Sequence, residues 1–232
     1  MSAAAVVVAA GLGRRMGTST PKAFLDVAGK PLYAWSLTAL LDSELFLALA
    51  LVVPAGWETV AQDYVDQAHP AAPLTVCTGG QERPASVLAG IKAVAPSRPD
   101  LVAIHDGARP LLTQDLARRC LDAAAATGAA IAAAPCTDTL KEASDGVVAR
   151  TLDRSKMWRA QTPQVFRLDL ILRAYDAAHA AGFQATDDAA LVERLGEPVA
   201  LVPSDWTNLK VTTPADLVVA EALLRHRGLA SH

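Results

Sequence analysis

Residues 4–22 read AAVVVAAGLGRRMGTSTPK, and this stretch decides the fold that the sequence predicts. Residues 4–9 form a short apolar run of the kind that makes a strand buried on both faces of a sheet. A glycine-rich turn that carries several cations follows directly. In a parallel sheet, ligands bind beyond the carboxyl ends of the strands, where backbone N–H groups of such a turn approach phosphates closely. The stretch therefore predicts the first strand of a parallel sheet and an anion-binding loop after it.

The loop after this strand matches neither of two common phosphate-binding motifs. Gly11 and Gly13 form a G-x-G without the third glycine of a dinucleotide fingerprint, and the GK[ST] ending of a P-loop is missing. The loop instead carries Arg14, Arg15 and Lys22. Such cations suit a nucleoside triphosphate, because attack at the α-phosphorus builds negative charge on the equatorial oxygens and on the departing pyrophosphate. A flexible, solvated basic loop is the alternative interpretation.

Beyond this loop, short apolar runs alternate with amphipathic stretches. The alternation predicts an α/β domain with a Rossmann-like, mostly parallel sheet and helices on both faces. The predicted strands are residues 4–9, 45–53, 74–77, 101–105, 130–134, 199–202 and 209–211, and the predicted helices are residues 31–41, 57–67, 84–95, 114–127, 168–181, 187–195 and one that opens at Pro214. Residues 136–154 interrupt the pattern with a turn signal at Ser144, Asp145 and Gly146, which predicts an inserted β-hairpin arm.

Composition narrows the class of protein. A chain of 232 residues is long enough for one α/β domain over residues 1–232, and no apolar run reaches the roughly 18 residues that a membrane span needs. The start of the chain has no basic segment before its apolar run, which predicts a first strand rather than an export signal, and hence a cytoplasmic protein. Three separated cysteines fit neither a disulfide framework nor a zinc site. The net charge of −3 argues against nucleic acid as a partner.

Eight segments, in order and in spacing, carry a resemblance to a known family. They are AAGLGRRMGTSTPKAFLDVAGKPL from residue 9, GGQERPASVLAGI from residue 79, HDGARP from residue 105, TDTLK from residue 137, TLDR from residue 151, TPQVF from residue 162, TDDA from residue 186 and NLKVT from residue 208. Together they cover nearly the whole chain and resemble the 2-C-methyl-D-erythritol 4-phosphate cytidylyltransferase family of the non-mevalonate isoprenoid pathway. Val8, where many relatives have Pro, and Gly107, where Ala is frequent, depart from the pattern without removing a reactive group.

The resemblance implies an enzyme that uses CTP and Mg²⁺ to place a cytidylyl group on a polyol phosphate, with release of pyrophosphate. It implies catalytic roles for Arg15, Lys22, Arg154 and Lys210, and Asp106 as the metal ligand. The implied CTP contacts are Ala9, Ala10, Gly11, Gly13, Gly80, Gln81, Arg83, Ser86, Asp106 and Gly107, and the implied acceptor contacts are Arg109, Thr139, Arg154, Thr162, Thr186 and Lys210. It further implies a homodimer formed through the arm.

The residues themselves leave several alternatives open. Asp106 follows a buried strand, as a Mg²⁺ ligand would, yet an N-cap or an ion pair with Arg109 has the same sequence pattern. Arg83 fits a salt bridge with Glu82 equally well, and Lys210 fits a solvent-facing position in a strand. For the whole chain, the rival functions are ribitol 5-phosphate cytidylyltransfer and a non-catalytic nucleotide-sensing module.

Overall fold

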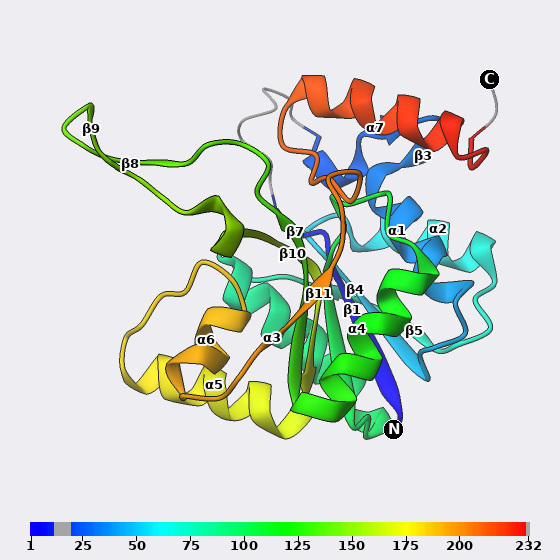
Figure 1. The fold of residues 1–232 in the computed structure, drawn as a ribbon. Helices are drawn as coiled ribbons and strands as arrows, with labels where there is room; N and C mark the ends of the chain where they lie inside the picture. The colour runs from blue at the N-terminus through cyan, green and yellow to red at the C-terminus, as the bar shows by residue number, and fades with distance from the viewer. Residues whose placement is uncertain (12–19, 231–232) are drawn as a thin grey trace.

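A seven-stranded sheet forms the centre of the computed structural model, which describes residues 1–11 and 20–230 (Figure 1). The strand order is β11-β7-β10-β6-β1-β4-β5, and β10 runs antiparallel to β6 and β7 while the other neighbours pair in parallel. The mostly parallel sheet that the sequence predicts is thereby confirmed. The strands are β1 (Ala3–Val8), β4 (Ala48–Val53), β5 (Leu74–Thr78), β6 (Leu101–Asp106), β7 (Ala129–Pro135), β10 (Trp158–Arg167) and β11 (Ala200–Pro203).

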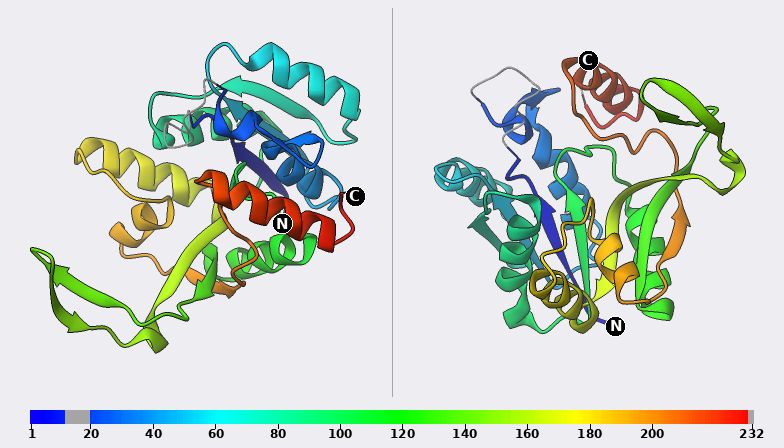
Figure 2. Two further views of the ribbon diagram at one scale, coloured as in Figure 1. Left: turned by 90° about the horizontal axis from the view of Figure 1, so that it is seen from above. Right: turned by 90° about the vertical axis from the view of Figure 1, so that its left-hand side faces the viewer.

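Helices cover both faces of this sheet, because their apolar sides meet strands that are buried on both faces. One face packs against α1 (Leu32–Leu41), α2 (Glu58–Ala68) and α4 (Gln114–Thr127). The opposite face packs against α3 (Arg83–Val94), α5 (Leu168–Ala180) and α6 (Ala189–Arg194). A third apolar cluster joins α7 (Pro214–His226) to α1. Figures 1 and 2 show α7 lying over the carboxyl ends of the strands. A short ribbon, β2 (Asp26–Val27) with β3 (Lys30–Pro31), lies beside α7.

Two parts of the strand prediction differ from the structure. The prediction of a strand at residues 209–211 is wrong: the segment lies outside the sheet, and its backbone contact is one hydrogen bond from Val211 N to Ala108 O of 2.9 Å. Conversely, the sequence analysis assigned no strand where β10 lies. Pro163 interrupts that run, and prolines are rare inside central strands. The structure accommodates it with a register shift between Ala160 and Gln164.

The arm is an extension of the β7–β10 hairpin, and it projects away from the domain (Figures 1 and 2). Its strands are β8 (Lys141–Ser144) and β9 (Val147–Thr151), and every residue of both is exposed. Asp145 and Gly146 join them with φ of +53° and +79°. Two residues of positive φ are what a tight hairpin turn of matching twist requires. The predicted hairpin is confirmed.

The chain order reverses at the centre of the sheet. From β1 the chain moves outward to β4 and β5, and α3 then returns it to β6 on the other side of β1. Val8 and Asp106, the last residues of β1 and β6, are register partners. Ligands of open α/β sheets bind in the crevice at such a reversal, beyond the carboxyl ends of the strands.

Candidate active site

A pocket of about 760 Å³ opens at this reversal point. Its walls come from the end of β1, the turn before α3, the end of β6 and the segment before α7. Ten residues of the predicted site line it: Ala9, Ala10, Gly11, Lys22, Gly80, Gln81, Arg83, Ser86, Asp106 and Lys210. Segments that are far apart in the sequence therefore meet in one cavity.

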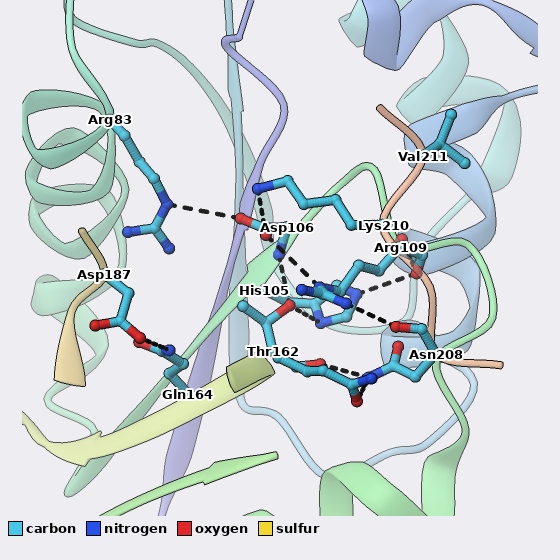
Figure 3. A network of polar contacts seen from close by, with 12 residues as sticks. Arg83, His105, Asp106, Arg109, Thr162, Gln164, Asp187, Asn208, Lys210 and Val211 are labelled. Atoms are coloured by element: carbon cyan, nitrogen blue, oxygen red, sulfur yellow. Dashed lines mark hydrogen bonds and ion pairs between the residues drawn. The ribbon is translucent and has the colours of Figure 1, made fainter. Parts of the chain in front are cut away.

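Asp106 is a carboxylate in this pocket that cations surround (Figure 3). Its Oδ2 lies 2.8 Å from Lys210 Nζ and 3.7 Å from Arg109 Nε, and its Oδ1 lies 3.6 Å from Arg83 Nε. Burial by itself raises the pKa of Asp106, but the charges of Lys210 and Arg83 outweigh burial and hold its pKa well below the usual range. The carboxylate is ionised, and three cations from three segments surround it. The ion pair with Arg109, left open by the sequence, is present but is the longest of the three.

Arg83 is held by a second buried carboxylate rather than by Glu82. Its Nη2 lies 2.8 Å from Oδ2 of Asp188, whose side chain is 1% exposed. Asp188 Oδ1 accepts a 2.5 Å hydrogen bond from the Tyr175 hydroxyl. Burial lowers the pKa of Arg83, but the carboxylates of Asp188 and Asp106 outweigh it and raise that pKa. The guanidinium is therefore a fixed charge between α6 and the end of β6.

Gln164 of β10 fixes the start of α6 and with it Asp188. Its Oε1 accepts the backbone N–H groups of Asp188 and Ala189 at 3.2 and 3.1 Å, and its Nε2 donates to Asp187 Oδ2 at 2.8 Å. These contacts supply partners to N–H groups that have none inside the helix. The sheet thus sets the position of Arg83 through two intermediate residues.

The turn from Gly79 to Ser86 is braced from within. Ser86 is 2% exposed, and its hydroxyl accepts Gly80 N–H at 3.1 Å and donates to Glu82 O at 3.1 Å. A Cβ on Gly79 would overlap both Ala10 and Ser86, so the close approach of the two loops requires glycine there. The Ser86 hydroxyl therefore holds the turn that lines this side of the pocket.

His105 and Thr162 support Asp106 from behind. Thr162 Oγ1 accepts Asp106 N–H at 3.0 Å and lies 3.0 Å from His105 Nδ1, while His105 Nε2 lies 3.3 Å from Arg109 O. The Thr162 hydroxyl hydrogen then points to Nδ1, and the imidazole carries its proton on Nε2. His105 is fully buried, and burial lowers its pKa to about 4. The imidazole is therefore neutral and supports Asp106 through Thr162.

The other predicted site residues lie elsewhere. Gly107, Arg109 and Thr162 are buried behind the pocket wall. Thr139 and Arg154 lie exposed on the arm, and Thr186 lies exposed before α6, so none of these three lines the pocket. Gly13 and Arg15 lie outside the described residues. Sequence reasoning missed Asp188, Gln164, Tyr175 and Asn208 as supports of the site, although the first two and the last stand in the TDDA, TPQVF and NLKVT segments.

Comparisons with known proteins give one consistent result. The family model described as 2-C-methyl-D-erythritol 4-phosphate cytidylyltransferase matches residues 3–226. The proteins of that name from Syntrophus aciditrophicus and Pelotomaculum thermopropionicum are 44% and 45% identical to this chain, over 95% and 97% of it and 95% and 94% of their own lengths. The crystal structure of the protein of that name from Thermus thermophilus superposes with a TM-score of 0.80 at 36% identity, covering 97% of this chain and 100% of the other.

Proposed function

The chain belongs to the 2-C-methyl-D-erythritol 4-phosphate cytidylyltransferase family, and we propose that residues on the two sides of Asp106 divide the family reaction between CTP and the acceptor. The enzyme converts CTP and 2-C-methyl-D-erythritol 4-phosphate to 4-diphosphocytidyl-2-C-methyl-D-erythritol and pyrophosphate, in isoprenoid biosynthesis. The observation that supports the division is the meeting of Arg83, Lys210 and Asp106 in one pocket at the reversal point of the sheet.

CTP would occupy the side of the pocket formed by the end of β1 and the turn before α3. Backbone N–H groups at Ala10 and Gly11 face the triphosphate, and the turn with Gly80 and Gln81 receives the cytosine. Lys22, together with Arg15, offsets the charge that develops on the α-phosphoryl oxygens and on the departing pyrophosphate. Gly13 is a further proposed contact of this subsite, and Gly107 supports it from behind the pocket wall.

The acceptor phosphate would lie on the Lys210 side. One of its oxygens attacks the α-phosphorus, the bond to the β-phosphoryl oxygen breaks, and pyrophosphate leaves with that electron pair. No general base is needed, because a phosphate oxygen is already anionic at neutral pH. Lys210 holds this oxygen in line with the α-phosphorus. Arg109 and Thr162, which lie behind the pocket wall, support this side through their contacts with Asp106, and Thr186, which does not line the pocket, remains a proposed acceptor contact. Thr139 and Arg154 reach it from the arm of a second subunit.

Mg²⁺ fits the carboxylate of Asp106. This ion takes one or two protein carboxylates and leaves its other positions to water and phosphate oxygens. Within the described residues no three His, Cys, Asp or Glu side chains form a cluster able to hold a metal, so a cage made by protein alone is not the arrangement we propose. The bound ion would supply positive charge to the phosphate oxygens, while Asp106 and Lys210 hold their places beside it.

Domain organisation, assembly and location complete the proposal. We propose one domain over residues 1–232 and a homodimer formed through the arm. A cytoplasmic location is supported by Cys77, Cys120 and Cys136, all of which are free thiols. Among the helices of the described chain, none is long and apolar enough to cross a membrane.

Pyrophosphate release with CTP tests the proposal. The acceptor panel contains 2-C-methyl-D-erythritol 4-phosphate, ribitol 5-phosphate and a hexose phosphate. We expect turnover with the first and little with the others. Preference for ribitol 5-phosphate would replace the acceptor assignment, and CTP binding without turnover of any acceptor would indicate a nucleotide-sensing module instead.

Replacing Lys210 by Ala tests the division between the subsites. Because the two phosphates bind on different sides of Asp106, we expect KM for the polyol phosphate to rise by roughly tenfold or more and CTP affinity to change little. The measurements are initial rates across acceptor concentrations and a CTP titration by calorimetry. Equal loss of CTP binding would contradict the separate subsites.

A further inference from the structure

Lys210 stands in a segment without helix or strand, so its position needs another explanation. The sheet ends with β11 at Pro203, and α7 starts at Pro214. Between them the chain crosses the carboxyl ends of the strands and places Lys210 Nζ 2.8 Å from Asp106 Oδ2. A long side chain on an unsupported segment would spread over many positions. Some contact must therefore fix the backbone near Lys210.

Asn208, two residues earlier, supplies that contact (Figure 3). Its side chain is buried, with 3% of the residue exposed. Nδ2 donates to Gln161 Oε1 at 3.0 Å and to Thr162 O at 2.9 Å, which ties the segment to β10. Its backbone oxygen accepts from Arg109 Nη1 at 2.7 Å, which ties the segment to the loop after β6. One residue therefore joins the segment to β10 and to the loop after β6.

The orientation of the Asn208 amide follows from its partners. Thr162 offers a backbone carbonyl, which only accepts. Gln161 donates its own Nε2 to Asp205 O at 2.9 Å, so its Oε1 faces Asn208 and also accepts. The position consequently requires a group with two N–H donors. An aspartate of the same shape would set a carboxylate against two acceptor oxygens.

The segment is held on its other side at Val211. Val211 N donates to Ala108 O at 2.9 Å, and Val211 O accepts from Lys22 Nζ at 2.6 Å. Lys210 is thus bracketed by two tethered residues. Its side chain, 38% exposed, projects from this bracket to Asp106.

We propose that Asn208 is a positioning residue of the reaction, which sets Lys210 at Asp106 through its amide contacts with Gln161 and Thr162. The inference rests on the proposed role of Lys210 at the acceptor phosphate. Asn208 lies outside the pocket lining and acts through the backbone that carries the lysine.

Steady-state kinetics of Asn208→Ala and Asn208→Asp test the inference on the full-length protein. We expect each to raise KM for the polyol phosphate by about tenfold with KM for CTP within about twofold, since a buried donor pair is lost on the acceptor side. The double variant Asn208→Ala with Lys210→Ala is expected to be no worse than Lys210→Ala alone, because the lysine that Asn208 positions is already gone.

The matched control is Thr207→Val, in the same segment. It removes hydroxyl contacts with Asp205 Oδ1 at 2.5 Å and Arg227 Nη2 at 2.7 Å, and it leaves in place the amide contacts of Asn208 with Gln161 and Thr162. We expect it to lower thermal stability slightly and leave both KM values unchanged. Gln161→Ala removes one acceptor of the Asn208 amide from the opposite side and should reproduce a smaller rise in acceptor KM, so the test survives if the Asn208 variants fold poorly.

The outcomes separate the two proposals. If Lys210→Ala retains the parent's acceptor KM, the proposed function of Lys210 fails. If Lys210→Ala is impaired but the folded Asn208 and Gln161 variants have the parent's kinetics, the positioning role fails. If the effects of the two single variants on acceptor KM multiply in the double variant, Asn208 acts independently of Lys210 and the inference is overturned. Equal rises in KM for CTP and for the acceptor would likewise make Asn208 a structural residue.

Discussion

We propose that the charge of Lys22 acts on the transition state of the reaction. It lines the pocket next to Ala23, and its Nζ is anchored on Val211 O at 2.6 Å. Charge on the triphosphate grows as pyrophosphate departs, so a fixed cation there acts mainly on the transition state. We predict that Lys22→Ala lowers kcat by about 100- to 1000-fold and changes acceptor KM far less. Steady-state rates measure kcat and the acceptor KM. The control is Lys30→Ala, which changes a lysine outside the pocket. A kcat within a few-fold of the parent would remove Lys22 from the mechanism.

Asp188 carries a second prediction at the residue scale. It is 1% exposed and pairs with Arg83 and Tyr175, so a neutral side chain there leaves the guanidinium without its nearest carboxylate. Removing one partner of a buried ion pair costs about 3–5 kcal/mol. We predict that Asp188→Asn loses about 3 kcal/mol in urea unfolding and binds CTP more weakly. The exposed pair of Asp169 with Arg167 provides the control, since Asp169→Asn should change stability by less than about 0.5 kcal/mol. Equal stabilities of the two variants would contradict this account.

The positions of some charged pocket residues could be predicted, whereas their partners could not. Segments after predicted strands indicated Lys22 and Asp106, because ligand residues gather at the carboxyl ends of parallel strands, while the family resemblance indicated Arg83 and Lys210. The pairing of Arg83 with Asp188 joins residues more than a hundred positions apart, and no local pattern encodes it. In the same way, no sequence pattern shows that the Ser86 hydroxyl bonds within its own turn.

At the scale of elements, periodicity succeeded where one face or both faces of a segment are apolar. The helix predicted at residues 114–127 is α4 residue for residue, with Thr113 as the N-cap that accepts Leu116 N–H and Gly128 at the C-cap with φ of +91°. Periodicity failed at β10, where polar residues and Pro163 occupy a central strand. It also failed at residues 209–211, which belong to a loop held by side-chain contacts. Hydrogen bonds to side chains leave no periodic signal.

Burial of Cys120 in α4 makes the stability of the protein depend on pH. It is fully buried, and burial raises the pKa of its thiol from 9.0 to about 12. The unfolded chain loses this proton above pH 9 while the folded chain keeps it, so stability is complete below pH 9 and falls as pH rises toward 12. We predict that at pH 10 the parent has lost about 1 kcal/mol more of its unfolding free energy, relative to pH 7, than Cys120→Ala has. Urea titrations at both pH values measure the difference, and identical losses would show that the thiol does not ionise on unfolding.

At the scale of the whole molecule, the arm is the feature that the single chain does not explain. Its two strands pair with each other, and Val147 and Val148 are 70% and 58% exposed. A lone two-stranded hairpin is marginal in water, so an arm of this kind gains stability only from a surface on which it packs. In the homodimer that we propose, a second copy of the chain would supply that surface and place both arms in equivalent positions. Thr139 and Arg154, which lie off the pocket of their own chain, would then serve the partner's acceptor subsite.

Subunit exchange tests this arrangement. Lys22→Ala and Arg154→Ala are each expected to be inactive alone, because each removes a cation from every site. If Arg154 acts in the partner's site, a hybrid dimer contains one doubly altered site and one intact site. Random exchange of equal amounts makes half of the dimers hybrids, so about a quarter of all sites regain activity. If Arg154 acts within its own chain, every site still lacks one residue and no activity returns. Mass spectrometry verifies exchange, and verified exchange without recovered activity would refute the shared site.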